Sequence, residues 1–210
     1  MRHRFKLPVI LLLLVCFQVV GVMSVDATKM KKRNIGELVA LGDQIIVGKV
    51  VSVTDGFGDH NVPYTEVTVE VRETAKGTAS GTYTFRQWGL IKPRDMGNGL
   101  TNLSVTMDGW PTYAQNEDVV LFLYKEARVT GLRTTVGLFQ GKFTIKDGYV
   151  SNAMGNEGLF DRINFHRLNL TEKEKGMVQS KRGAIPEEMF LSFLRKSIEE
   201  QWFFEELGGE

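Results

Sequence analysis

The sequence predicts a mainly β protein whose central part is a small closed barrel of five or six antiparallel strands, with a short helix before it and an amphipathic helix after it. Polar and aliphatic residues alternate in YTEVTVEVRETAKG (64–77), as in a strand with one exposed face. Other apolar, β-branched runs bounded by turn residues occur between residues 44 and 152. Glycines inside two runs favour closure, which removes the exposed edges of a short meander. A β-sandwich is the alternative.

The first elements of the predicted domain, residues 34–152, are a short helix and a strand. Asn34 and Glu37 have the spacing of a capping box, and Gly42 is placed to end the helix. The run QIIVGKVVSVT (44–54) is apolar on both faces up to Gly48 and alternates afterwards, which indicates a strand with a bend or bulge at the glycine.

Two further strands complete a predicted meander. In residues 64–77, Val67 and its neighbours at a spacing of two face one side, and charged or hydroxyl side chains face the other. TYTFRQWG (82–89) alternates in the same way, with Tyr83 and Phe85 on one face. Consecutive strands joined by short turns pair most simply as an antiparallel meander.

Residues 89–117 break the strand pattern. The segment is too long and too rich in glycine for a plain connector, and loops of this length are usually functional or mobile. LSVTM (103–107) is expected to form one short strand within it.

Regular strands are expected again from residue 118. DVVLFLYK (118–125) is apolar on both faces and predicts a buried strand. VGLFQGKFTI (136–145) predicts another, in which Phe139, Phe143 and Ile145 share a face and Gly141 admits a close backbone. An Asp-Gly turn then precedes a small edge strand, YV.

The C-terminal extension, residues 153–210, is expected to be helical in part. Thr171 and Glu174 match a capping box, and Pro186 is placed to open a helix over 186–204 with an apolar face that packs on the barrel. Trp202, Phe203 and Phe204 are adjacent, so they cannot all face one core. We therefore expect these aromatics to engage a partner.

Residues 1–27 have a basic start, an apolar run and small residues near the end, the pattern of an export signal. Cleavage is expected before Thr28, or before Val25; an uncleaved anchor is the alternative. The mature chain is then periplasmic or extracellular, with no membrane span. Loss of residues 1–27 changes the formal net charge from +1 to −1.

The near-neutral charge argues against nucleic acid as a partner, since phosphate binding needs a concentrated surplus of Lys and Arg. The short basic run of Lys29, Lys31, Lys32 and Arg33 is expected to be a solvated arm. Cys16 is the only cysteine and lies in the signal, so thiol catalysis, thiolate zinc sites and disulfides are excluded for the mature chain.

The sequence predicts no enzyme, no cofactor and no metal site. His60 and His166 lack a second ligand at metal-site spacing, and no serine-hydrolase, zincin or phosphate-loop motif is present. Asp55, Asp59 and Asn61 have oxygen atoms suited to calcium but lack the rest of a standard calcium loop, so a plain turn is favoured.

GDQIIVGKVVSV, YTEVTVEVRETAKG, NEDVVLFLY and VGLFQGKFTI, in that order, resemble a group of uncharacterised exported bacterial proteins over roughly residues 34–152. The pattern is also similar in outline to the netrin-like domain of the tissue inhibitors of metalloproteinases, which implies an OB-type five-stranded barrel and protease inhibition. Those inhibitors chelate zinc through an N-terminal cysteine. Here the mature end is Thr28 or Val25, so that chemistry does not carry over.

The first functional hypothesis is an exported, non-catalytic binding or assembly module that contacts another exported or cell-envelope protein. Its expected contact residues surround the long loop and include the C-terminal aromatics: Trp88, Trp110, Tyr113, Trp202, Phe203 and Phe204. The alternative is a regulator or inhibitor of an exported protease that acts by loop insertion, and a third is an unrecognised hydrolase. The sequence indicates neither the ligand nor an oligomeric state.

Overall fold

The computed structural model describes residues 30–203, the side chain of Arg167 excepted. The chain divides into two compact units, Met1–Lys31 and Lys32–Glu210. The described part of the first unit is Met30 and Lys31, and every helix and strand below belongs to the second. The expected export signal with Cys16, and the aromatic residue Phe204, lie outside the described residues.

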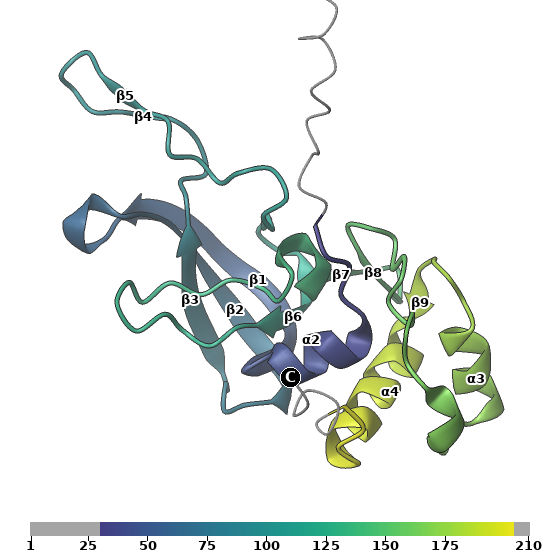
Figure 1. Ribbon diagram of the computed structural model, residues 1–210. Coiled ribbons are helices and arrows are strands. Elements are labelled where there is room, and N and C mark those ends of the chain that lie inside the picture. Colours follow the sequence, from purple (N-terminus) through teal and green to yellow (C-terminus); the bar gives the residue numbers. More distant parts are fainter. Residues whose placement is uncertain (1–29, 204–210) are drawn as a thin grey trace, which may run out of the picture. The chain divides into compact units, whose positions relative to one another are not determined.

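A seven-stranded antiparallel sheet in the order β3-β2-β1-β6-β7-β8-β9 forms the centre of the second unit (Figure 1). This confirms the mainly β prediction and the β1-β2-β3 meander. The strands of this sheet are β1 (Gln44–Phe57), β2 (Pro63–Lys76), β3 (Thr82–Trp88), β6 (Asp118–Leu123), β7 (Lys142–Lys146), β8 (Tyr149–Asn152) and β9 (Ile185–Pro186). A second, two-stranded sheet pairs β4 (Arg94–Asp95) with β5 (Thr101–Asn102).

The described helices are short. They are the α-helices α2 (Ile35–Leu41), α3 (Glu172–Val178) and α4 (Glu187–Glu199) and the 3₁₀ helices η2 (Asp59–Asn61), η3 (Leu138–Gly141) and η4 (Phe165–Arg167). Between residues 30 and 203, no helix combines the length and the apolar character needed to cross a bilayer.

The sheet is open, which corrects the expectation of a closed barrel. Residues 132–136 contact both outer strands, β3 and β6, of the group β3-β2-β1-β6. The amide of Arg133 donates to the Arg86 carbonyl in β3 at 2.7 Å, and the amide of Val136 donates to the Phe122 carbonyl in β6 at 2.7 Å. The sheet therefore curls toward closure, but β3 meets this segment through a single bridge, at Leu132. The outer edge of β6 is used instead by β7, which continues the sheet.

Each face of the sheet carries its own hydrophobic core. Helices α2 and α4 pack on one face, where β1 and β6 contribute Ile45, Val47, Val120 and Phe122. On the other face a smaller core contains Ile46, Val50, Val67, Phe85 and Leu121, with part-buried Tyr83 and Tyr113 against it. This confirms that β6 and the first half of β1 are buried on both faces.

The pairing of β1 with β2 is irregular at Gly48, where the sequence predicts a bend or bulge. The register between the strands shifts between Val47 and Gly48. A Cβ at position 48 would lie 2.2 Å from the carbonyl oxygen of Glu70, well inside van der Waals contact. The strands can approach this closely only because the residue has no side chain.

Two strand predictions are corrected. The expected strand over residues 136–145 begins only at Lys142, because Leu138 has a φ of 58° and residues 138–141 form η3, which takes Phe139 out of the strand. Gly141 does admit a close backbone, since a Cβ there would lie 2.4 Å from the Val136 carbonyl. The strand expected at residues 103–107 is replaced by β5 and one bridge at Val105.

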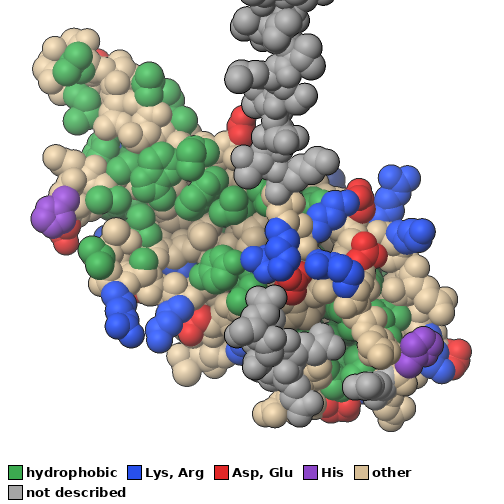
Figure 2. All heavy atoms as spheres, in the orientation of Figure 1, with side chains coloured by type: hydrophobic (Ala, Val, Ile, Leu, Met, Phe, Trp, Pro, Cys, Tyr) green, Lys and Arg blue, Asp and Glu red, His purple; other side chains and the backbone are tan. Residues whose placement is uncertain are grey.

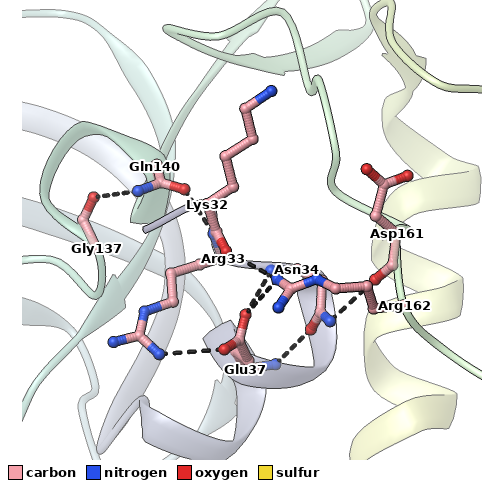
Figure 3. Close-up of polar contacts among 8 residues, drawn as sticks. All are labelled: Lys32, Arg33, Asn34, Glu37, Gly137, Gln140, Asp161 and Arg162. Carbon is pink, nitrogen blue, oxygen red and sulfur yellow. Dashed lines mark hydrogen bonds and ion pairs between the residues drawn. The ribbon is translucent and has the colours of Figure 1, made fainter. Parts of the chain in front are cut away.

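Helix α2 starts with the predicted capping box. The Asn34 side chain accepts from the Glu37 amide at 2.9 Å, and the Glu37 carboxylate accepts from the Asn34 amide at 3.0 Å. The same region is tied to the rest of the fold, because Asn34 Nδ2 donates to the Asp161 carbonyl at 3.0 Å (Figure 3). Arg162 and Arg33 each lie 3.2 Å from the Glu37 carboxylate.

Within the basic run, Arg33 is held in the fold, which corrects the expected solvated arm at this residue; Lys29 lies outside the described residues. Arg33 is half-buried, and its amide donates to Gln140 Oε1 at 2.7 Å (Figure 3). Lys32 forms an exposed ion pair with Glu157.

Helix α4 ends at Glu199, earlier than residue 204. The amide of Trp202 donates to the Ser197 carbonyl at 3.0 Å and Gln201 has a φ of 54°, so the chain turns back over the helix end. Trp202 then packs edge-on against Phe193, at 5.5 Å between ring centres. Phe203 is only 4% exposed and lies against Gly36.

Candidate interaction surface on the β4–β5 arm

Residues 90–107 form a hairpin, here called the arm, that extends away from the end of β3 (Figure 1). Its two legs join at the base, where the Leu90 amide donates to the Ser104 carbonyl at 2.8 Å and the Thr106 amide donates to the Leu90 carbonyl at 2.9 Å. Gly89 precedes this junction with a φ of 101°, and a Cβ there would lie 2.7 Å from the Thr106 backbone. The glycine thus allows the legs to approach.

The tip of the arm is held by local hydrogen bonds. The Met96 amide donates to the Leu100 carbonyl at 3.0 Å, which closes the turn. Side chains complete it: Asp95 accepts from the Gly97 amide at 2.8 Å, and Asn98 accepts from the Leu100 amide at 3.0 Å. Because these polar groups are paired within the turn, the tip holds its own conformation.

Asp55, near the end of β1, fastens the arm to the sheet. Its carboxylate forms an ion pair with Arg94 of β4 and accepts from the Ile91 amide at 2.8 Å. The Arg94 guanidinium also lies over the Phe57 ring, 5.5 Å from its centre. The Asp55 side chain considered as a calcium ligand is therefore engaged within the protein.

The arm carries an unusual density of exposed apolar side chains. Of the eight most exposed large hydrophobic residues in the described chain, five lie on it, with exposed fractions from 49% to 72%. These five, here called the arm patch, are Ile91, Met96, Leu100, Leu103 and Met107. In Figure 2 green side chains run from the arm onto the adjoining face.

Two of the predicted contact residues lie at the base of the arm. Trp88 ends β3 and Trp110 follows the second leg; their ring centres are 6.3 Å apart and both side chains are half-buried. Trp110 also lines a hollow of about 320 Å³ with Phe139 and Lys142. The Lys142 ammonium is already bound to Glu117 at 2.6 Å and to the Thr112 carbonyl at 2.7 Å, so this hollow offers few free polar groups.

Tyr113 is placed differently from the expectation. Its ring packs edge-on against Phe85, at 5.7 Å between centres, and belongs to the smaller core. Its hydroxyl is buried without a hydrogen-bond partner, and burial, with Glu117 nearby, raises the pKa of this group. Tyr113 therefore packs beneath the loop, with its hydroxyl buried and only part of its side chain exposed.

The C-terminal aromatics are also used within the fold. Phe203 is buried, and Trp202 packs on Phe193 with Lys196 above its ring at 5.3 Å. These contacts remove Phe203 from the surface that a partner can reach. Phe204 lies outside the described residues.

The described residues show no arrangement suited to metal chemistry. His60 and His166 are both exposed, and residues 30–203 contain no group of three or more His, Cys, Asp or Glu side chains placed to hold a metal ion.

Sequence reasoning located the loop but missed the arm patch. Four of the five, at positions 96, 100, 103 and 107, have the spacing of one helix face, but the turn residues Gly97, Asn98 and Gly99 disfavour a helix there. Large aliphatic side chains in a segment whose turn residues prevent a buried element are the signal that identifies such a surface.

Comparisons with known proteins give no relative. No protein-family model matches the chain, and neither the curated proteins nor the solved structures contain a match.

Proposed function

We propose that the protein is an exported, non-catalytic binding or assembly module, and that the arm patch is its contact surface for another exported or cell-envelope protein. The observation that carries this proposal is the exposure of five large apolar side chains on one fastened hairpin. Exposed apolar side chains scattered singly are ordinary, whereas a contiguous group usually marks an interaction site.

Energetic considerations support this use of the arm. Full burial of one such side chain stabilises a complex by roughly 1.5–3 kcal/mol relative to exposure. The base and tip of the arm are already hydrogen-bonded, so binding requires little further ordering of its backbone. Trp88 and Trp110, beside the arm, are of the residue type most often found at the centre of interfaces.

The experiment replaces Leu103, which is 72% exposed, by Asp and asks whether a partner still co-purifies with the full chain from its native host. Val129, which is 97% exposed on another loop, provides the matched control, Val129→Asp. We expect Leu103→Asp to lose a stoichiometric partner that Val129→Asp retains, with both variants folded by circular dichroism. Retention by both variants would contradict the proposal.

We also propose that the curled part of the sheet is an incomplete barrel of the OB type. Strands β1, β2, β3 and β6 enclose the smaller core, and the bridges Arg86–Leu132 and Leu123–Thr135 connect a single segment to β3 and to β6. The resemblance to the netrin-like domain supports the same assignment. A structure of the chain with its partner, in which residues 132–136 pair fully with β3, would support it.

Regulation of an exported protease is the second candidate function. A projecting hairpin with a hydrogen-bonded tip has the form of a segment that enters a cleft, and Met96 and Leu100 flank that tip. The test is inhibition of proteases from the same compartment by the mature chain. No effect at micromolar concentration would remove this candidate and leave the binding module.

A further inference from the structure

A separate hollow of about 300 Å³ lies between α3 and the segment that leads into α4, away from the arm. Its floor is apolar and includes Phe160, Met177 and Ile185, which belong to the larger core. We call it the α3 pocket. Because a water molecule takes up about 30 Å³, a space of this size accepts a compact ligand of roughly ten non-hydrogen atoms.

The charge at the pocket is one-sided. Lys173 and Arg182 line it, and none of its lining residues is Asp or Glu. Neither cation forms a hydrogen bond or an ion pair through its side chain with any residue in the described range 30–203; Arg182 only accepts, through its carbonyl, from the Ser180 hydroxyl. Glu157, the acid that interacts with Arg182 at longer range, is already in contact with Lys32.

Gly176 lines the pocket. It lies inside helix α3, where glycine is less favourable than alanine by about 1 kcal/mol. A Cβ at this position would meet nothing within 4 Å, so no neighbouring atom requires the missing side chain. A larger side chain at this exposed position therefore has room to enter the pocket.

We infer that the α3 pocket binds a small monocarboxylate with a compact apolar tail. The tail occupies the floor, and the carboxylate pairs with Arg182 and Lys173, whose ammonium and guanidinium groups suit that anion. An apolar hollow with a few convergent charged groups is the usual composition of a small-molecule site. This inference does not depend on the function proposed for the arm.

Octanoate, a carboxylate with ten non-hydrogen atoms, is the probe. We expect saturable binding to the full chain with a dissociation constant of about 0.1–1 mM, measured by calorimetry or by NMR chemical-shift changes. Octanol and octylamine share the tail but lack the anion, so we expect each to bind at least about tenfold more weakly. Equal binding of all three probes would overturn the inference.

Substitutions in the pocket lining test whether the probe binds there. Arg182→Gln together with Lys173→Gln should weaken octanoate at least about tenfold, while Lys125→Gln, an exposed cation on another loop, should not. Gly176→Leu should fill the space and abolish binding, with thermal stability unchanged or raised. If Gly176→Leu does not fold, Ala184→Leu, at an exposed lining residue, serves instead. Undiminished binding by the filled variant would contradict the inference.

Discussion

At the scale of single residues, the fold depends on positions where backbones come unusually close. Gly48 is the clearest, because a Cβ there would lie 2.2 Å from the Glu70 carbonyl oxygen and 2.8 Å from a methyl group of Val69. Both neighbours belong to β2, which carries its own pairing to β3. Neither strand can move without breaking the sheet, so the glycine is a structural requirement.

We predict that Gly48→Ala lowers the free energy of unfolding by about 2–4 kcal/mol, because the added methyl group forces β1 and β2 apart. Urea denaturation followed by circular dichroism measures the change. Gly176→Ala is the matched control, since its methyl group meets open space on a helix, and it should raise the free energy of unfolding by about 1 kcal/mol. Equal effects of the two variants would show that close approach at Gly48 is not limiting.

At the scale of elements, helix ends link the parts of the fold. Asn34 both caps α2 and donates to the Asp161 carbonyl, so one side chain connects the first helix to the C-terminal extension (Figure 3). The capping spacing is legible in the sequence, but the second bond is not, because residues 34 and 161 are brought together only by the fold. The shared core of β1, β6 and α4 is likewise a tertiary outcome.

We predict that Asn34→Ala destabilises the protein by about 1–2 kcal/mol, since the cap and the bond to Asp161 are both lost. Asn34→Asp keeps an oxygen that can accept from the Glu37 amide but removes the Nδ2 donor, so it should fall between the wild type and Asn34→Ala. Thermal denaturation of the three chains separates the two contributions. An Ala variant as stable as the wild type would contradict this account of α2.

The cap of α3 makes stability depend on pH. Burial opposes ionisation of Glu174, but hydrogen bonds with Thr171 and the Lys196 ammonium at 3.5 Å outweigh it and hold the pKa of this carboxyl below its usual value of 4.5. The stabilisation is therefore fully present above the usual value and is lost as the pH falls through the lowered one.

We predict that Glu174→Gln destabilises the protein at pH 7 by about 1 kcal/mol, and that this effect shrinks as the pH falls through the lowered pKa of the wild-type carboxyl. Denaturation at pH 7 and at a series of acidic pH values measures the difference. Glu172→Gln, in the same turn, is the control: its side chain is 89% exposed and its loss should change stability little across the series. A Glu174→Gln effect that does not depend on pH would contradict the lowered pKa.

At the scale of the whole second unit, sequence periodicity predicted β1, β2, β3 and β6 but did not predict how the sheet continues beyond β6. β1 and β6 are buried on both faces of the sheet, and their continuous aliphatic runs predict this because a strand with one exposed face would alternate with polar residues. The sequence does not predict that the sheet is open, because this depends on β7 pairing with the outer edge of β6. The packing of Tyr113 against Phe85 and the burial of Phe203 depend on residues that are distant in the sequence, so spacing alone does not reveal them.

The arm is expected to be dispensable for folding. None of the residues 91–105 is buried, and Leu90, which is, lies at the base. We predict that replacing residues 95–101, which form the tip, by a two-residue Asn-Gly turn between the antiparallel partners Arg94 and Asn102 shifts the melting temperature by less than about 3 °C, the change expected for 1 kcal/mol in a chain of this size. Loss of cooperative unfolding in the shortened chain would assign the arm to the folding core instead.

The central claim, that the arm patch contacts another protein, is tested most directly by photocrosslinking in the native host. One full-length chain carries Leu103→benzoylphenylalanine and a second carries Val129→benzoylphenylalanine, at two exposed apolar positions on different loops. We predict one dominant covalent adduct with an exported or cell-envelope protein from position 103 and none from position 129. No adduct at position 103, or the same set of adducts at both positions, would contradict the account.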